Sequence, residues 1–152
     1  NPAHKNIDYV FYMRGLTNMA ADYNFFQDFL GIDRDDKDPS YARQAFQDFK
    51  TLLQSYPNSS YAADARARMV GLKTRLARYD LGVAEYYVKR DALIAAANRA
   101  KLVVETYPDT VETEKALEIM VNAYDTLKMP TLARHAREVL AKNYPDNRLG
   151  RG

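Results

Sequence analysis

Hydrophobic positions recur at helical spacing along much of this 152-residue chain. One stripe contains Phe46, Phe49, Leu52 and Leu53, and a second has similar spacing: Leu93, Ala96, Ala97, Ala100, Val103 and Val104. Steps of three or four residues place side chains on one face of an α-helix. The six Gly and six Pro are too few for the frequent turns of a β-sandwich. The pattern therefore predicts an all-α fold.

Three tetrapeptides that begin with Tyr-Pro divide the helical pattern: Tyr56–Ser59, Tyr107–Thr110 and Tyr144–Asn147. Each predicts a helix end, because Pro disfavours helix in the residue before it, and the next residue suits the start of another helix. An Ala lies twelve residues before each Pro, at positions 45, 96 and 133. Tyr87 and Tyr124 lie nine residues before the last two of these Ala residues. The last two units therefore repeat with a 37-residue offset.

This spacing resembles the tetratricopeptide repeat, a helix pair of about 34 residues with a closing Pro. The small residue of such a repeat allows its two helices to approach closely, and the Tyr fills the gap between neighbouring pairs. The resemblance implies a right-handed solenoid of about three helix pairs. Ala100 and Arg137 stand where the repeat has an aromatic residue, so the second and third units are degenerate.

We expect one repeat array over residues 1–152, with units at 6–55, 60–106 and 110–145. The predicted helices lie at about 7–20, 40–55, 61–89, 91–106, 112–127 and 131–143, followed by a frayed end. An insertion at 21–38 interrupts the first unit. Its apolar half is expected to fold over the first repeat, or alternatively to dock a partner. Its acidic half does not fit an EF-hand, because Asp38 and Gln44 replace the required Gly and Glu.

Composition and charge argue against several classes of function. The 22 basic and 20 acidic residues give a net charge of only +2, which is no footprint for nucleic acid. There is no Cys, and neither His4 nor His135 belongs to a catalytic or metal-binding motif. We therefore predict no enzyme, cofactor or metal site. Four carboxylates are interpreted as ordinary and unpaired: Asp80, Glu85, Asp91 and Glu105.

A more specific resemblance lies in the run Asn6–Ala20, together with Asp38-Pro39, the three Tyr-Pro tetrapeptides and Val83–Tyr87. These residues resemble the BamD family, outer-membrane lipoproteins of the β-barrel assembly machinery in Gram-negative bacteria. The resemblance implies a five-repeat protein of which this chain matches the last three repeats. It also implies a place at the periplasmic face of the outer membrane. The lipidated Cys that would anchor the protein is expected outside this sequence, and this part is expected to be soluble.

The resemblance further implies partners: the POTRA region of BamA and the lipoproteins BamC and BamE. The pair Asn98-Arg99 matches the family position where an arginine meets an acidic POTRA residue. By residue pattern alone, Arg99 would be an ordinary solvated arginine on a helix. We therefore predict that Arg99 anchors BamA, with neighbours Arg90, Asn98, Lys101 and Glu105.

The C-terminal 25 residues, from Lys128, carry six basic and two acidic residues, a balance of +4. This segment is interpreted as a solvated cap of the array, as a docking face for BamE or BamA through Arg134, Arg137 and Lys142, or as a lipid-adsorbing surface.

The predicted function is a non-enzymatic scaffold of β-barrel assembly. The alternative is a peptide-binding groove that recognises C-terminal segments of unfolded outer-membrane proteins. Such a groove would be lined by Tyr86, Tyr87, Tyr107 and Tyr124.

Overall fold

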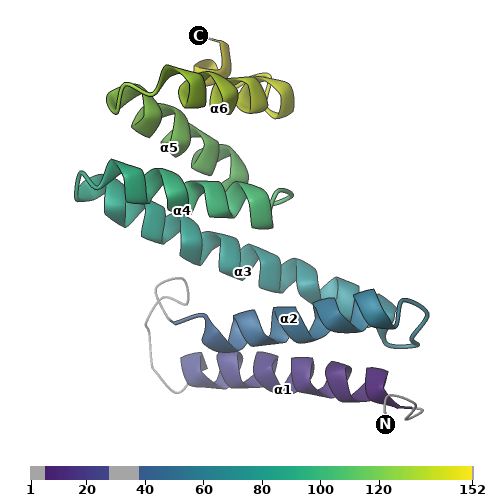
Figure 1. Ribbon diagram of the computed structural model, residues 1–152. Helices are drawn as coiled ribbons and strands as arrows, with labels where there is room; N and C mark the ends of the chain where they lie inside the picture. The colour runs from purple at the N-terminus through teal and green to yellow at the C-terminus, as the bar shows by residue number, and fades with distance from the viewer. Residues whose placement is uncertain (1–5, 28–37, 152) are drawn as a thin grey trace. The chain divides into compact units, whose positions relative to one another are not determined.

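The computed structural model describes residues 6–27 and 38–151, without the side chains of residues 23–27. These residues form α1 (Ile7–Gln27), α2 (Ser40–Ser55), α3 (Ala62–Lys89), α4 (Leu93–Thr106), α5 (Glu112–Thr126), α6 (Pro130–Asn143) and the 3-10 helix η2 (Arg148–Arg151) (Figure 1). The predicted all-α fold is confirmed. None of the helices within residues 6–27 and 38–151 is a candidate membrane-spanning segment.

Two expectations at the helix boundaries were wrong. The first helix continues past residue 20 to Gln27, so the start of the predicted insertion is helical. The expected frayed end instead contains η2, where Gly150 lies directly against α6: a Cβ on Gly150 would be 2.8 Å from the backbone nitrogen of Ala141. Residues 28–37, which contain most of the insertion, lie outside the described residues, as do the predictions made for them.

The three Tyr-Pro tetrapeptides have the same local structure. Tyr56, Tyr107 and Tyr144 each follow a helix, with φ of −135°, −128° and −133°. In each case the Tyr N–H donates at 2.8 Å to the carbonyl four residues earlier, and the Tyr carbonyl accepts from the residue three positions later. The repeated sequence therefore forms a repeated helix stop, as the Pro in each tetrapeptide predicts.

The ends of α3 and α5 also match at the 37-residue offset. Asp91 and Lys128 have φ of 57° and 58°, in the left-handed region. The next residue in each case donates its N–H to the carbonyl of Tyr87 or Tyr124 at 2.9 Å. This six-to-one hydrogen bond defines a Schellman motif, which satisfies carbonyls left free at a helix end. Each motif turns the chain directly into the next helix.

The chain divides into two compact units, residues 1–76 and 77–152. In the first, α1 and α2 run antiparallel and side by side (Figure 1). Gly15 allows their close approach, because a Cβ at this position would lie 2.5 Å from the ring of Phe49. Phe49 is fully buried, so its ring has little room to move away.

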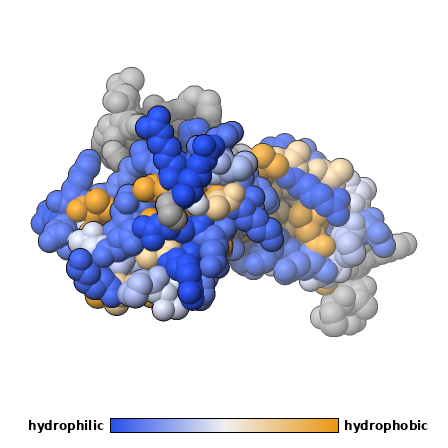
Figure 2. Space-filling view, turned by 90° about the horizontal axis from the view of Figure 1, so that it is seen from above, coloured by the Kyte–Doolittle hydropathy of each residue, from blue (hydrophilic) through white to orange (hydrophobic). Residues whose placement is uncertain are grey.

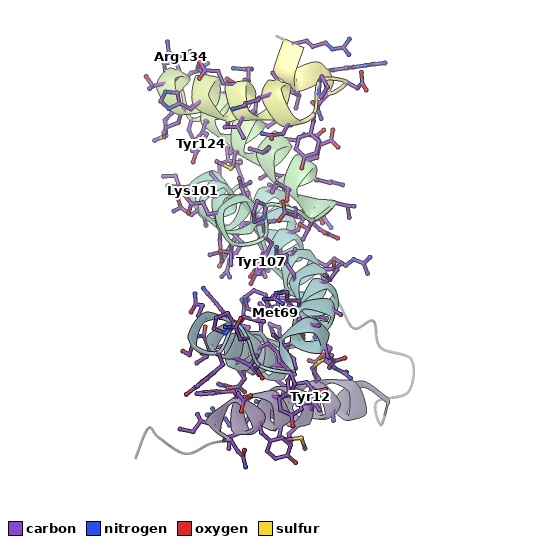
Figure 3. The ribbon with its side chains drawn as sticks, turned by 90° about the vertical axis from the view of Figure 1, so that its right-hand side faces the viewer. Tyr12, Met69, Lys101, Tyr107, Tyr124 and Arg134 are labelled. Atoms are coloured by element: carbon purple, nitrogen blue, oxygen red, sulfur yellow. The ribbon has the colours of Figure 1, made fainter. Side chains whose placement is uncertain are left out.

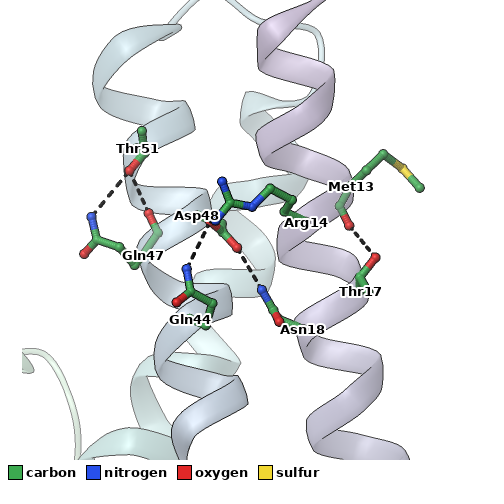
Figure 4. Close-up of polar contacts among 8 residues, drawn as sticks. All are labelled: Met13, Arg14, Thr17, Asn18, Gln44, Gln47, Asp48 and Thr51. Carbon is green, nitrogen blue, oxygen red and sulfur yellow. Dashed lines mark hydrogen bonds and ion pairs between the residues drawn. The ribbon is translucent and has the colours of Figure 1, made fainter.

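A buried carboxylate joins the same two helices (Figure 4). Asp48 is 2% exposed, although its helix otherwise buries Ala42, Ala45, Phe49 and Leu52. Its oxygens accept from Asn18 Nδ2 at 2.9 Å and from Gln44 Nε2 at 3.4 Å, and Arg14 Nη2 lies at 3.2 Å. Because a buried charge is tolerated only with such partners, this network fixes how α1 packs on α2.

Aromatic side chains connect α1 to the start of α3. The rings of Tyr12 and Tyr61 stack with centroids 4.6 Å apart, and the Tyr12 hydroxyl donates to Asp64 at 2.6 Å. Arg68 Nε also donates to Asp64, at 2.6 Å. The hydrogen bonds from Tyr12 and Arg68 lower the pKa of Asp64, and the bond to Asp64 raises the pKa of Tyr12.

One core cluster of the second unit joins three helices, and most of its residues are small. Ala97 of α4 packs in one cluster with residues of α5 and α6: Val121, Ala123, Tyr124, Ala133 and Ala136. The Ala residues twelve positions before each Pro, Ala45, Ala96 and Ala133, are all buried. Tyr107 and Tyr124 are buried too, so these two side chains pack inside the unit and do not line a peptide groove.

Candidate partner-binding site

The outer face of α4 carries most of the predicted partner-binding residues. This helix buries Ala96, Ala97, Ala100 and Val103 and exposes the opposite stripe, which consists of Ile94, Asn98, Lys101, Leu102 and Glu105. Ile94 is 58% exposed. Ile94 and Leu102 were missed in the sequence analysis. The available signal was their position: both are apolar residues four positions from Asn98, off the apolar stripe of the helix.

Arg99 lies at the edge of this stripe and contacts α3. Its Nη1 donates to Oδ1 of Asp80 at 3.0 Å. The Arg99 side chain is 33% exposed, whereas Asp80 is fully buried. The guanidinium is therefore held to a buried group of the same unit, while part of the Arg99 side chain stays exposed.

The interpretation of the four carboxylates as unpaired was wrong for three of them. Asp80 pairs with Arg99, Glu85 lies 3.4 Å from Lys115 Nζ, and Glu105 lies 3.6 Å from Lys101 Nζ. The Asp80 pair joins different helices and could not be found by spacing within one helix. One signal was available, because Asp80 lies at helical spacing with the buried Leu76, Ala77 and Ala84.

Arg90 and Asn98 lie in different environments. The Arg90 guanidinium lies 5.0 Å from the centre of the exposed Tyr86 ring, a cation–π arrangement. Asn98 lines an open hollow of about 610 Å³, together with Ile94, Ala95 and Leu127 and with the turn residues Asp91 and Ala92. The apolar part of the exposed stripe thus continues into a concave surface.

The predicted C-terminal docking residues all lie on α6. Arg134 is exposed and pairs with Glu138 at 3.8 Å, Arg137 is bonded to Asp125 of α5, and Lys142 is exposed. Figure 3 shows Arg134 on this helix and Lys101 on α4. Seen from the side of α6, the surface is mostly hydrophilic, with small separate hydrophobic areas (Figure 2). Arg134 and Lys142 are therefore available for polar contacts, whereas Arg137 is already engaged within the unit.

Within residues 6–27 and 38–151, no group of three His, Asp or Glu side chains is placed to hold a metal ion. Helix pairs closed by repeated turns, with small residues packed between the helices, define a helical-repeat protein. The chain belongs to the YfiO family, described as outer membrane lipoproteins, whose model matches residues 1–140.

Curated relatives are named outer membrane protein assembly factor BamD. The chain is 50% identical to the protein of Vibrio cholerae over 143 residues, which are 94% of this chain and 59% of that relative. It is 44% identical to the protein of Pasteurella multocida and 46% identical to that of Neisseria gonorrhoeae, covering 55% and 54% of their lengths. The resemblance to the BamD family is therefore confirmed, and the chain spans somewhat over half the length of these relatives.

Proposed function

We propose that this chain is a non-enzymatic binding part of the outer membrane β-barrel assembly machinery, and that it acts at the periplasmic face of the membrane. Its α4 surface binds the POTRA region of BamA, with Arg99 as the anchor and Arg90, Asn98, Lys101 and Glu105 around it. One observation carries this proposal: Arg99 is held by the buried Asp80 while a third of its side chain stays exposed. Such a group can engage a partner carboxylate without first becoming ordered.

The composition of the surrounding surface supports the same function. Protein interfaces combine a desolvated apolar centre with polar groups at the rim, and arginine is enriched among the residues that dominate binding energy. Ile94 and Leu102 supply exposed apolar area on α4, and Asn98 lies between them. Arg99, Lys101 and Glu105 supply charged groups next to this area.

We further propose that α6 binds the accessory lipoproteins BamC and BamE through Arg134 and Lys142, with Arg137 supporting the helix. The two sites can be separated by reciprocal variants in pull-downs with purified POTRA region and purified lipoproteins. We expect Arg99→Ala to reduce capture of the POTRA region only, and Arg134→Ala with Lys142→Ala to reduce capture of the lipoproteins only. Equal loss of both partners from either variant contradicts two separate sites.

A C-terminal peptide of an outer-membrane protein serves as a third probe in the same experiment. Because Tyr107 and Tyr124 are buried, we expect little capture of this peptide by the chain. Strong capture of the peptide without capture of the POTRA region would reverse the proposal in favour of a peptide-binding groove.

A further inference from the structure

A buried carboxylate lies directly behind the exposed arginine of the proposed site. Asp80 of α3 is 0% exposed, and Arg99 of α4 is held to it at 3.0 Å within the second unit. In the described part of the chain, Asp80 is the one side chain that accepts a hydrogen bond from Arg99. The remaining N–H donors of the guanidinium are left for groups outside this pair.

The other charged residues of the site are held differently. Lys101 and Glu105 form a pair at 3.6 Å in which both side chains are more than half exposed. A solvated pair of this kind restrains its side chains weakly. Arg90 rests on the ring of the exposed Tyr86. Of the basic residues proposed for the α4 site, Arg99 is thus the one with a fully buried partner.

A buried partner changes how an arginine binds. A free arginine loses rotamer freedom when a complex forms, and this loss reduces affinity. Asp80 restricts Arg99 before any complex forms, because a buried carboxylate is costly without its counter-charge. The planar guanidinium then presents its outer edge in a fixed orientation, which suits two-point contact with a carboxylate.

We propose that Asp80 is a positioning residue of the partner-binding site: it orients Arg99 toward an acidic side chain of the partner and does not itself touch the partner. This inference rests on the proposed function of Arg99. The competing explanation is that the pair only holds α3 against α4. The two explanations differ in how substitutions at the two positions combine.

The test is a double-mutant cycle measured by calorimetry against the purified POTRA region of BamA. The variants are Asp80→Asn, Arg99→Ala and their combination, with Asp80→Glu as a conservative replacement that keeps the charge. We expect Arg99→Ala to weaken binding by about tenfold or more, and Asp80→Asn to weaken it by about three- to tenfold. In the Arg99→Ala background, Asp80→Asn should have no further effect on affinity. Asp80→Glu should bind the POTRA region with most of the affinity that Asp80→Asn loses.

Each outcome separates the inference from the proposed function. If Arg99→Ala leaves the affinity unchanged, the proposed function of Arg99 fails and the inference fails with it. If Arg99→Ala weakens binding but Asp80→Asn does not, the function stands and the inference is wrong. Equal weakening by Asp80→Asn with and without Arg99 also overturns the inference, because it indicates a general loss of structure.

A second measurement does not depend on binding. Proton exchange of the Arg99 guanidinium can be followed by NMR in the folded protein without partner. We expect these protons to exchange faster with water in Asp80→Asn than in the unmodified chain, and an unchanged exchange rate would overturn the positioning role. Lys101→Ala is the matched control, since Lys101 is on the same helix but pairs with Glu105.

Discussion

At the scale of single residues, each unit contains a buried carboxylate that meets an arginine of a neighbouring helix. Asp48 lies near Arg14 at 3.2 Å, and Asp80 accepts from Arg99 at 3.0 Å. Both arginines keep part of their surface in water, with Arg14 54% exposed. The arrangement compensates an interior charge and leaves a basic group at the surface.

Replacing Asp48 tests how strongly such a carboxylate stabilises its unit. Asp48→Ala removes the acceptor of Asn18 and the counter-charge of Arg14, so we expect a loss of about 2–4 kcal/mol in the free energy of unfolding. Urea unfolding measures the change. Gln47→Ala, on the exposed face of the same helix, is the control and should change stability by less than about 0.5 kcal/mol. An Asp48→Ala variant as stable as this control would contradict the stabilising role.

The hydrogen bond from Tyr12 to Asp64 predicts a specific pH dependence. The lowered pKa of Asp64 stabilises the fold above the unfolded pKa of about 4, and this contribution is lost as pH falls through the folded value. The raised pKa of Tyr12 stabilises the fold below the unfolded pKa of about 10, and this contribution is lost as pH rises through the folded value. We expect Tyr12→Phe to lower the urea midpoint at neutral pH, with the difference shrinking in both acid and alkali.

The control for this measurement is Tyr9→Phe. The Tyr9 ring lies 5.8 Å from the Tyr61 ring but its hydroxyl has no hydrogen-bond partner among the described residues. We expect Tyr9→Phe to show no such dependence on pH. If the difference in urea midpoint between Tyr12→Phe and the unmodified chain stays constant from acid to alkali, the hydrogen bond is not its cause.

At the scale of helices, the left-handed residues Asp91 and Lys128 end α3 and α5 in the same way. A residue with a Cβ is strained by about 1 kcal/mol in this conformation, and Gly is not. We therefore expect Asp91→Gly and Lys128→Gly each to stabilise the chain by up to about 1 kcal/mol in thermal unfolding. Lys89→Gly, at the last residue of α3, should instead destabilise it by up to about 1 kcal/mol. A stability change of the same sign in Lys89→Gly and Asp91→Gly would contradict the assigned helix end.

The contact between α1 and α2 depends on Gly15. We expect Gly15→Ala to destabilise the first unit by about 1–2 kcal/mol, because the new methyl group overlaps the buried ring of Phe49. A methyl group added to Gly71 of α3 would meet no other side chain or neighbouring element within 4 Å, so Gly71→Ala should be neutral or stabilising through helix propensity. Chemical denaturation of both variants checks this contrast, and equal effects would mean that the close approach at Gly15 is unimportant.

Helix positions were predictable because their signals are local. The Tyr-Pro stops and the 37-residue offset predicted the boundaries of α2, α5 and α6 to within one residue. The extension of α1 to Gln27 was missed. The sequence after residue 20 continues into an apolar segment, and no stop signal marks where the helix ends. The pairing of Asp80 with Arg99 joins residues 19 positions apart on different helices. Pairing of this kind depends on how helices pack and is not encoded in spacing along one helix.

At the scale of the whole molecule, family membership and one surface of the second unit support the same proposed partner. The family model covers residues 1–140, which include all of α4 and most of α6. We propose that Arg99 anchors the POTRA region of BamA through its guanidinium. Arg99→Lys keeps the positive charge but not the planar fork, so it separates charge attraction from two-point recognition.

The most direct test is calorimetric titration of the purified POTRA region of BamA into the chain and into its Arg99→Ala and Arg99→Lys variants, with the folded fraction of each checked by circular dichroism. An Arg99 anchor predicts that both variants remain folded, that Arg99→Ala weakens binding by about tenfold or more, and that Arg99→Lys keeps only part of the affinity. Unchanged affinity in a folded Arg99→Ala variant would contradict it.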